Sequence, residues 1–159
     1  MLTESCLFPA PPDYREPSKT RPSLWGPIPA ATEIQSVSSG EFFDISVNVS
    51  SEDDGDDLVA LLFLNYLVGT QRNTGFNLTS VKAGTLSEER HISMTWRIPE
   101  WPSPGTCEQL SLVVSHFSNF DNGLPINDSD VDVVTWWLDI NDSKSTISEC
   151  AKRSGGVSP

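Results

Sequence analysis

The stretch FFDISVNVSSEDDGDDLVALLFLNYL, residues 42–67, contains two strand patterns joined by an acidic turn. In its first part every second side chain is apolar: Phe43, Ile45, Val47 and Val49. This period of two is the signature of a strand with one buried face. Residues 58–67 are apolar at nearly every position, which is typical of a central strand buried on both faces. The stretch therefore predicts two consecutive strands of a β-protein.

The same two-residue period recurs along the rest of the chain. It is clear in residues 91–98, 108–117 and 131–140, and shorter strands are expected at 33–37 and 78–81. No segment shows a sustained 3.6-residue period with a cap, so helices should be absent or limited to single turns. Short alternating strands at this density are the pattern of an antiparallel sandwich. We therefore predict an all-β fold, a single antiparallel immunoglobulin-like sandwich of about seven strands.

The order of these features resembles the bacterial immunoglobulin-like sandwich domains, close to the fibronectin type III and cadherin-like folds, of cell-surface and envelope proteins. A strand ends in the acidic turn 53–57, a central strand follows, a later strand opens at Cys107, and the last carries Trp136–Trp137. The resemblance covers roughly residues 31–150. The chain lacks the cysteine pair across the two core strands of antibody domains. The resemblance thus implies a surface or envelope module and not immune recognition.

Composition excludes some classes of partner. The chain has 159 residues, the size of one domain with a tail, and a formal net charge of −12 from 22 acidic and 10 basic residues. Nucleic acid and anionic membranes attract basic surfaces, so neither is expected as an electrostatic partner. Cations and basic protein surfaces remain, with plain solubility as the alternative use of the charge.

The first 30 residues differ from the rest in composition. Seven of the 12 prolines lie between Pro9 and Pro29. Proline favours extended polyproline conformations, so such a segment acts as a semi-rigid spacer of roughly 3 Å per residue. We predict a tether over residues 1–30, although Leu24, Trp25 and Ile28 have the apolar character to fold back onto the domain. The sandwich is expected over 31–150 and a polar tail over 151–159.

Two cysteines form a natural pair. Cys107 opens one predicted strand, and Cys150 lies beyond the end of the next. Antiparallel neighbours place the start of one strand beside the end of the other, so we predict a Cys107–Cys150 disulfide that ties residues 142–149 to the sandwich. Disulfides persist in oxidising compartments, which indicates an extracytoplasmic protein. Two reduced cysteines in a cytosolic protein are the alternative.

Cys6 is the odd cysteine. Ser5 before it and the polar, proline-rich segment after it resemble the processing site of a bacterial lipoprotein. That resemblance implies lipid attachment at Cys6, contact with a membrane through the lipid, and a location in the cell envelope, anchored to the outer membrane or secreted. Glu4 departs from the usual motif, and residues 1–5 contain no hydrophobic signal segment. A free thiol and a different disulfide arrangement are the alternatives.

No motif points to catalysis. The patterns G-x-S-x-G, H-E-x-x-H and C-x-x-C are all absent from the sequence. His91 and His116 fall at outward positions or at the ends of predicted strands, so we expect surface histidines with structural roles. Ser115 precedes His116 directly, but neighbours on a strand point to opposite faces. The sequence predicts a protein that is not an enzyme.

Acidic residues gather in two segments, 52–57 and 121–132. In an immunoglobulin-like sandwich these two loops lie at the same end. Calcium takes six to eight oxygen ligands in flexible geometry, and Gly55 permits the tight turn that such loops use. A solvated acidic surface is one interpretation of these segments, and a calcium site is the other. The candidate calcium ligands are Asp53, Asp54, Asp56, Asp57, Asp128 and Asp130.

The Trp136–Trp137 pair must divide between the two faces of its strand. Trp136 shares its phase with Leu138 and Ile140, so we assign it to the core. Trp137 is then a candidate binding residue for a protein or carbohydrate partner, unless a loop or the tether covers it.

These features together predict a non-enzymatic envelope or cell-surface protein that acts as a binding, adhesion or structural module. The alternative is an accessory carbohydrate- or protein-binding module of an extracellular enzyme system. Four N-x-S/T sites, the pattern of N-glycosylation, keep a secreted eukaryotic domain open as well: Asn48, Asn77, Asn127 and Asn141.

Overall fold

The computed structural model describes residues 18–66, 72–100, 106–141, 146–147 and 149–150. Strands dominate these residues, and two short 3₁₀ helices, η2 (Phe117–Asn119) and η3 (Asp128–Asp130), lie between the last long strands. The strands are β1 (Ser23–Ile28), β2 (Gln35–Val37), β3 (Phe42–Ser50), β4 (Leu58–Leu64), β5 (Arg72–Val81), β6 (Arg90–Arg97), β7 (Thr106–His116), β8 (Phe120–Asp121), β9 (Leu124–Pro125) and β10 (Val131–Ile140).

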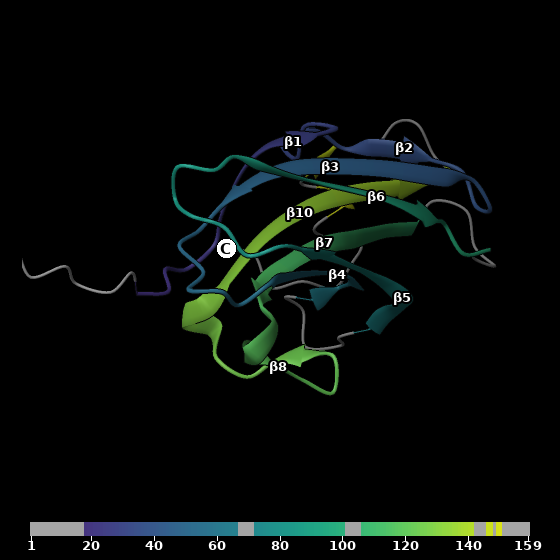
Figure 1. Cartoon of the computed structure of the whole chain (residues 1–159). Coiled ribbons are helices and arrows are strands. Elements are labelled where there is room, and N and C mark those ends of the chain that lie inside the picture. The colour runs from purple at the N-terminus through teal and green to yellow at the C-terminus, as the bar shows by residue number, and fades with distance from the viewer. Residues whose placement is uncertain (1–17, 67–71, 101–105, 142–145, 148, 151–159) are drawn as a thin grey trace, which may run out of the picture.

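Two sheets pack face to face (Figure 1). One has the order β1-β3-β6, and the other has the order β2-β10-β7-β4-β5; β8 and β9 form a separate small hairpin. The pairings are antiparallel except that of β2 with β10, which is parallel. The prediction of an all-β immunoglobulin-like sandwich is confirmed, and the seven predicted strands correspond to β2–β7 and β10.

The main core lies between the two sheets. Alternate residues of β3 and β6 face it from one side, as their two-residue period predicted, and β4, β7 and β10 face it from the other. All seven residues of β4 are buried, in agreement with a central strand covered on both faces. Trp136 is fully buried in this core, and its indole Nε1 donates a hydrogen bond to the Pro29 carbonyl at 2.7 Å.

A second, smaller core covers part of the outer face of the five-stranded sheet. Its buried side chains come from β4, β7 and the start of β10: Val59, Leu61, Phe63, Val113 and Val131. Phe120 of the β8–β9 hairpin packs against them. The segment 117–130 therefore folds back over the sheet instead of extending into solvent.

The structure corrects the predicted boundary between tether and sandwich. Residues 23–28 form β1, which pairs with β3, and the Thr20 N–H donates to the Glu52 carbonyl at 2.8 Å. The sandwich thus begins before residue 31. Pro27 is compatible with this position because β1 is an edge strand with an irregularity between Trp25 and Ile28. Residues 1–17 of the predicted tether and the tail 151–159 lie outside the described residues.

The described helical segments include none that is long and apolar enough to cross a membrane.

The predicted bond between Cys107 and Cys150 is present in the structure. Cys107 is buried on the outer face of β7, and Cys150 is buried at the end of a helical turn in which its N–H donates to the Thr146 carbonyl at 2.9 Å. The disulfide thus attaches the described residues 146–147 and 149–150 to the five-stranded sheet.

Candidate functional site

Three connecting segments meet at one end of the sandwich, which we call the acidic pole: the turn 51–57, the β5–β6 loop 82–89 and the segment 117–130. Backbone hydrogen bonds join them. The Asp53 N–H donates to the Gly84 carbonyl at 3.2 Å, and the Phe117 N–H donates to the Asp57 carbonyl at 2.8 Å. The turn is closed by Asp54 and Gly55, which both have positive φ. The two acidic segments singled out in the sequence therefore do lie together.

A buried histidine connects these segments. The His116 side chain has no exposed surface; its Nε2 lies 3.0 Å from Asp53 Oδ1, and its Nδ1 lies 2.7 Å from Asp130 Oδ1. Each ring nitrogen of His116 therefore has a carboxylate oxygen within hydrogen-bond distance, one from the turn 51–57 and one from the segment 117–130. We call this set, Asp53–His116–Asp130, the clasp.

Other groups complete the environment of the clasp. Asp53 Oδ2 accepts from the Gly84 N–H at 2.8 Å and also pairs with Arg90 Nη1. Asp130 accepts from the Ser115 hydroxyl at its backbone carbonyl. A buried ion pair is favourable only when such additional hydrogen bonds satisfy the remaining lone pairs. Arg90 and the Gly84 N–H thus satisfy the second oxygen of the fully buried Asp53.

The neighbouring carboxylates Asp56 and Asp57 have lysine partners. Asp56 Oδ2 accepts from Lys19 Nζ at 2.6 Å, and Asp57 Oδ2 accepts from Lys82 Nζ at 2.7 Å. Burial by itself would raise the pKa of Asp56, but hydrogen bonds from Lys19 and Ser118 outweigh it and hold that pKa below its ordinary value. Hydrogen bonds from Lys82 and from the Ala83 N–H likewise lower the pKa of Asp57. Both groups therefore stay ionised at any physiological pH.

The segment 117–130 is held in a fixed shape by Asn119. This buried side chain donates to the Asn127 carbonyl at 2.9 Å and accepts from the Asn127 N–H at the same distance. Its amide also donates to the Ser115 hydroxyl at 2.8 Å. These bonds close the loop around the β8–β9 hairpin, in which Phe120 packs against the sheet.

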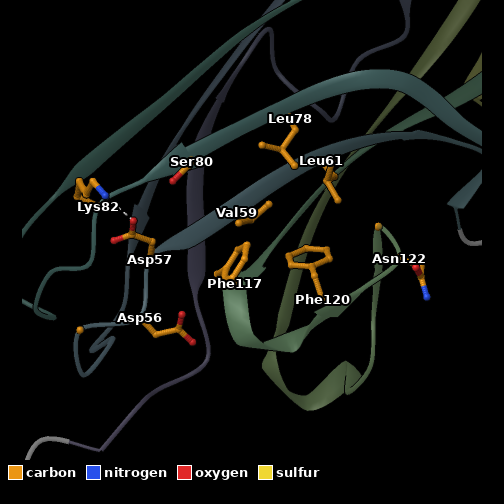
Figure 2. A pocket seen from close by; sticks show the side chains of 12 residues that line it. Asp56, Asp57, Val59, Leu61, Leu78, Ser80, Lys82, Phe117, Phe120 and Asn122 are labelled. Carbon is orange, nitrogen blue, oxygen red and sulfur yellow. Dashed lines mark hydrogen bonds and ion pairs between the residues drawn. The ribbon is translucent and has the colours of Figure 1, made fainter.

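A pocket of about 820 Å³ opens between this segment and the outer face of β4 and β5 (Figure 2). Its walls are mainly apolar: Val59 and Leu61 from β4, Leu78 from β5, and Phe117 and Phe120 from the segment 117–130. Figure 2 shows Asp57 and Lys82 at one end and Asn122 toward the other. Concave, mostly apolar pockets with a few polar groups are the usual form of a binding site. We call it the outer-face pocket.

The predicted calcium ligands have three different environments in the structure. Asp53 and Asp130 share His116, Asp56 and Asp57 hold lysines, and Asp54 and Asp128 are exposed. Burial, and to a smaller extent the Asp128 carboxylate, raises the pKa of Tyr66. Across the described ranges, no group of three or more His, Cys, Asp or Glu side chains is placed to hold a metal ion. Calcium binding at the acidic pole stays a prediction.

Thermal unfolding tests that prediction. If calcium binds a defined site here, a calcium concentration one hundred times the dissociation constant should stabilise the fold by about 2.7 kcal/mol. The double substitution Asp54→Asn and Asp56→Asn should remove this gain. Equal shifts in melting temperature with magnesium, calcium and sodium at matched ionic strength would contradict a site, because screening has no such selectivity.

The remaining predicted residues have different outcomes. Trp137 is half-buried on the outer face of β10, opposite in phase to the buried Trp136. Cys6 lies outside the described residues. The prediction of a surface position for His116 is wrong, because this side chain is fully buried. A usable signal was present: Leu110, Leu112, Val114 and His116 share one phase of the alternation, which places the histidine on the buried face of β7.

No protein-family model and no curated protein matches the sequence. Solved structures resemble it in fold. One is the CARDB domain of the PF1109 protein from Pyrococcus furiosus, solved in complex with di-metal ions: identity 14%, 78% of this chain and 88% of that chain covered, TM-score 0.44. A second is the alkylpurine DNA glycosylase AlkC of Pseudomonas fluorescens bound to DNA with an abasic site analog. Its identity to this chain is 15%, the match covers 76% of this chain and 31% of that chain, and the TM-score is 0.40.

A third is the ASH/PapD-like domain of human CEP192, with 10% identity, coverage of 91% of this chain and 100% of that chain, and a TM-score of 0.33. With TM-scores below 0.5, these likenesses carry no inference about binding or activity. The class of protein rests on the structure itself, an immunoglobulin-like β-sandwich with a pocket on its outer face.

Proposed function

We propose that this protein is a non-enzymatic binding module that works outside the cytoplasm, in the cell envelope or at the cell surface, and is attached through a lipid at Cys6. The observation that carries the proposal is the Cys107–Cys150 disulfide. Such bonds persist in secreted and envelope proteins and are rare in the reducing cytosol. Because Cys107 and Cys150 are bonded to each other, we assign Cys6 a separate role.

The clasp supports a role without catalysis. Both ring nitrogens of His116 already have carboxylate partners, and the ring has no exposed surface. A general base needs a free nitrogen within reach of a substrate proton. Ser115 donates to the Asp130 carbonyl and not to His116, so the adjacent pair does not form an activated nucleophile. The polar network of the acidic pole serves to hold the walls of the pocket.

Membrane fractionation of the natural full-length gene product tests attachment at Cys6. The wild-type protein should remain with the membrane after a salt wash and be released by detergent, because several acyl chains anchor a protein firmly. The Cys6→Ser variant should be released without detergent, and a Ser18→Ala variant should behave as the wild type does. A wild-type protein that is released by salt alone and carries an unmodified Cys6 thiol would rule out the anchor.

The alternative role, as an accessory module of an extracellular enzyme system, rests on Trp137. This indole stays partly exposed on β10 and could stack on a sugar ring. Retention of the protein on insoluble polysaccharide, lost when Trp137 is replaced by Ala, would favour that alternative.

A further inference from the structure

The outer-face pocket combines an apolar interior with exposed apolar walls. Leu78 is 56% exposed and Phe117 is 67% exposed, although both border the same cavity. Val59 and Leu61 form its floor and belong to the small second core. Apolar surface that gathers in a concave site and is rimmed by polar groups marks a place for a ligand or a partner. The interior therefore suits an aliphatic or aromatic side chain.

Two carboxylates at one end of this pocket pair with lysines of the same chain. Asp56 and Asp57 both line it, and each carboxylate holds a lysine Nζ of this chain. The Lys82 side chain is 90% exposed, so its ion pair with Asp57 is a surface pair of small net strength. Asp57 does not depend on Lys82 for its orientation, because its Oδ1 also accepts from the Ala83 N–H at 2.9 Å. An incoming cation can therefore replace Lys82 on a carboxylate that is already in position.

The net charge of the whole chain also favours a cationic ligand. The formal net charge of −12 favours the approach of basic partners and opposes acidic ones. Asp56, the second acidic side chain of the pocket, accepts hydrogen bonds from Lys19 and from the Ser118 N–H. These bonds fix the position of its carboxylate. An apolar cavity with a carboxylate end in an acidic protein matches an apolar residue beside a basic one.

We infer that the outer-face pocket binds a peptide segment of a protein partner in which an aromatic or aliphatic side chain stands next to a lysine or arginine. The apolar side chain lies against Leu61, Leu78 and Phe117, and the cation takes the place of Lys82 on Asp57. This inference rests on the proposed function as a binding module and gives the chemistry of the partner. It does not depend on the lipid at Cys6, so the two tests can fail separately.

The experiment titrates the full chain with short blocked peptides and follows backbone amide resonances. The probe is Gly-Leu-Phe-Lys-Lys-Gly; Gly-Leu-Phe-Glu-Glu-Gly reverses its charge, and Gly-Ser-Ser-Lys-Lys-Gly removes its apolar part. The first peptide should cause saturable shifts centred on Leu61, Leu78 and Phe117. The other two should each bind at least about tenfold more weakly, because each lacks one half of the recognition.

Variants with matched controls locate the site. Phe117→Ser and Asp57→Asn should each weaken the binding of the first peptide by about tenfold or more. The controls are Phe42→Ser and Asp44→Asn on β3 of the other sheet; Phe42 is 70% exposed, so it matches Phe117 in exposure. The controls should leave binding unchanged.

Three results would overturn the inference. The first is equal affinity for the Lys-Lys and Glu-Glu peptides, which would remove the role of Asp57. The second is a set of shifts centred on Trp137 or on β6. The third is the absence of saturable peptide binding together with a concentration-dependent dimer that Phe117→Ser dissociates, which would assign the pocket to a second copy of this chain.

Discussion

Replacing His116 by Leu should destabilise the fold by about 3 kcal/mol, because it removes a fully buried polar side chain and leaves the buried Asp53 carboxylate without one of its partners. Asp53 would keep Arg90 and the Gly84 N–H, but it would lose the donor at Oδ1. Asp130 would lose its contact with Nδ1 and keep Ser115 as a donor. Leu fills much of the same volume, so the loss reflects missing donors more than a cavity. Urea denaturation measures it as a lower transition midpoint.

The matched control is His91→Leu. His91 is exposed on β6 and contacts Asn48 through Nδ1 at 3.0 Å, so its replacement should change stability by no more than about 0.5 kcal/mol. Hydrogen exchange adds a local readout. Amides of the segment 117–130 should exchange faster in His116→Leu, whereas those of β3 and β6 should lose protection only with global stability. Equal effects of the two substitutions would show that the clasp does not stabilise the acidic pole.

Removing the disulfide with the double substitution Cys107→Ala and Cys150→Ala should destabilise the protein by about 4 kcal/mol. The two cysteines are 43 residues apart, and the chain-entropy relation gives this value for a loop of that length. The physical cause is the larger freedom that the unfolded chain gains when the loop is open. Guanidinium or thermal unfolding of the oxidised wild type and of the variant gives the difference directly.

The Cys6→Ala variant is the control for this experiment, because it changes a cysteine without touching the bridge. It should unfold as the wild type does. Reduction of the wild type should lower its stability toward that of the double variant and leave the double variant unchanged. A double variant within about 1 kcal/mol of the wild type would contradict the restriction of the unfolded chain as the source of the bond's contribution.

The fold was predictable where local pattern and burial agree. β3 and β6 bury one face, so a two-residue period marks them, and β4 is apolar throughout because both its faces are covered. β7 is also covered on both faces, but the buried Ser111 and Ser115 interrupt its apolar residues and keep the period visible. β1 has no such signal. It is an edge strand that contains Pro27 and also Gly26, which has a positive φ. In the sequence these residues have the composition of a proline-rich spacer. The β8–β9 hairpin is too short to show any period.

The site was predictable only in part. The meeting of the two acidic segments followed from the topology of the sandwich, but the burial of Asp53 did not. That burial depends on Arg90 and His116, which are 37 and 63 residues away in sequence. The outer-face pocket also forms from residues that are distant in sequence, since its walls come from β4, β5 and the segment 117–130. No local pattern encodes side chains that meet only after the chain has folded.

The most direct test of the proposed extracytoplasmic role is a non-reducing peptide map of the protein isolated from its natural source. One cross-linked pair should contain Cys107 and Cys150, and the peptide with Cys6 should lie outside the bridge and carry a lipid. Free thiols at Cys107 and Cys150 in material alkylated at the moment of lysis would contradict the account, because the compartment and the left-over Cys6 both depend on that bond.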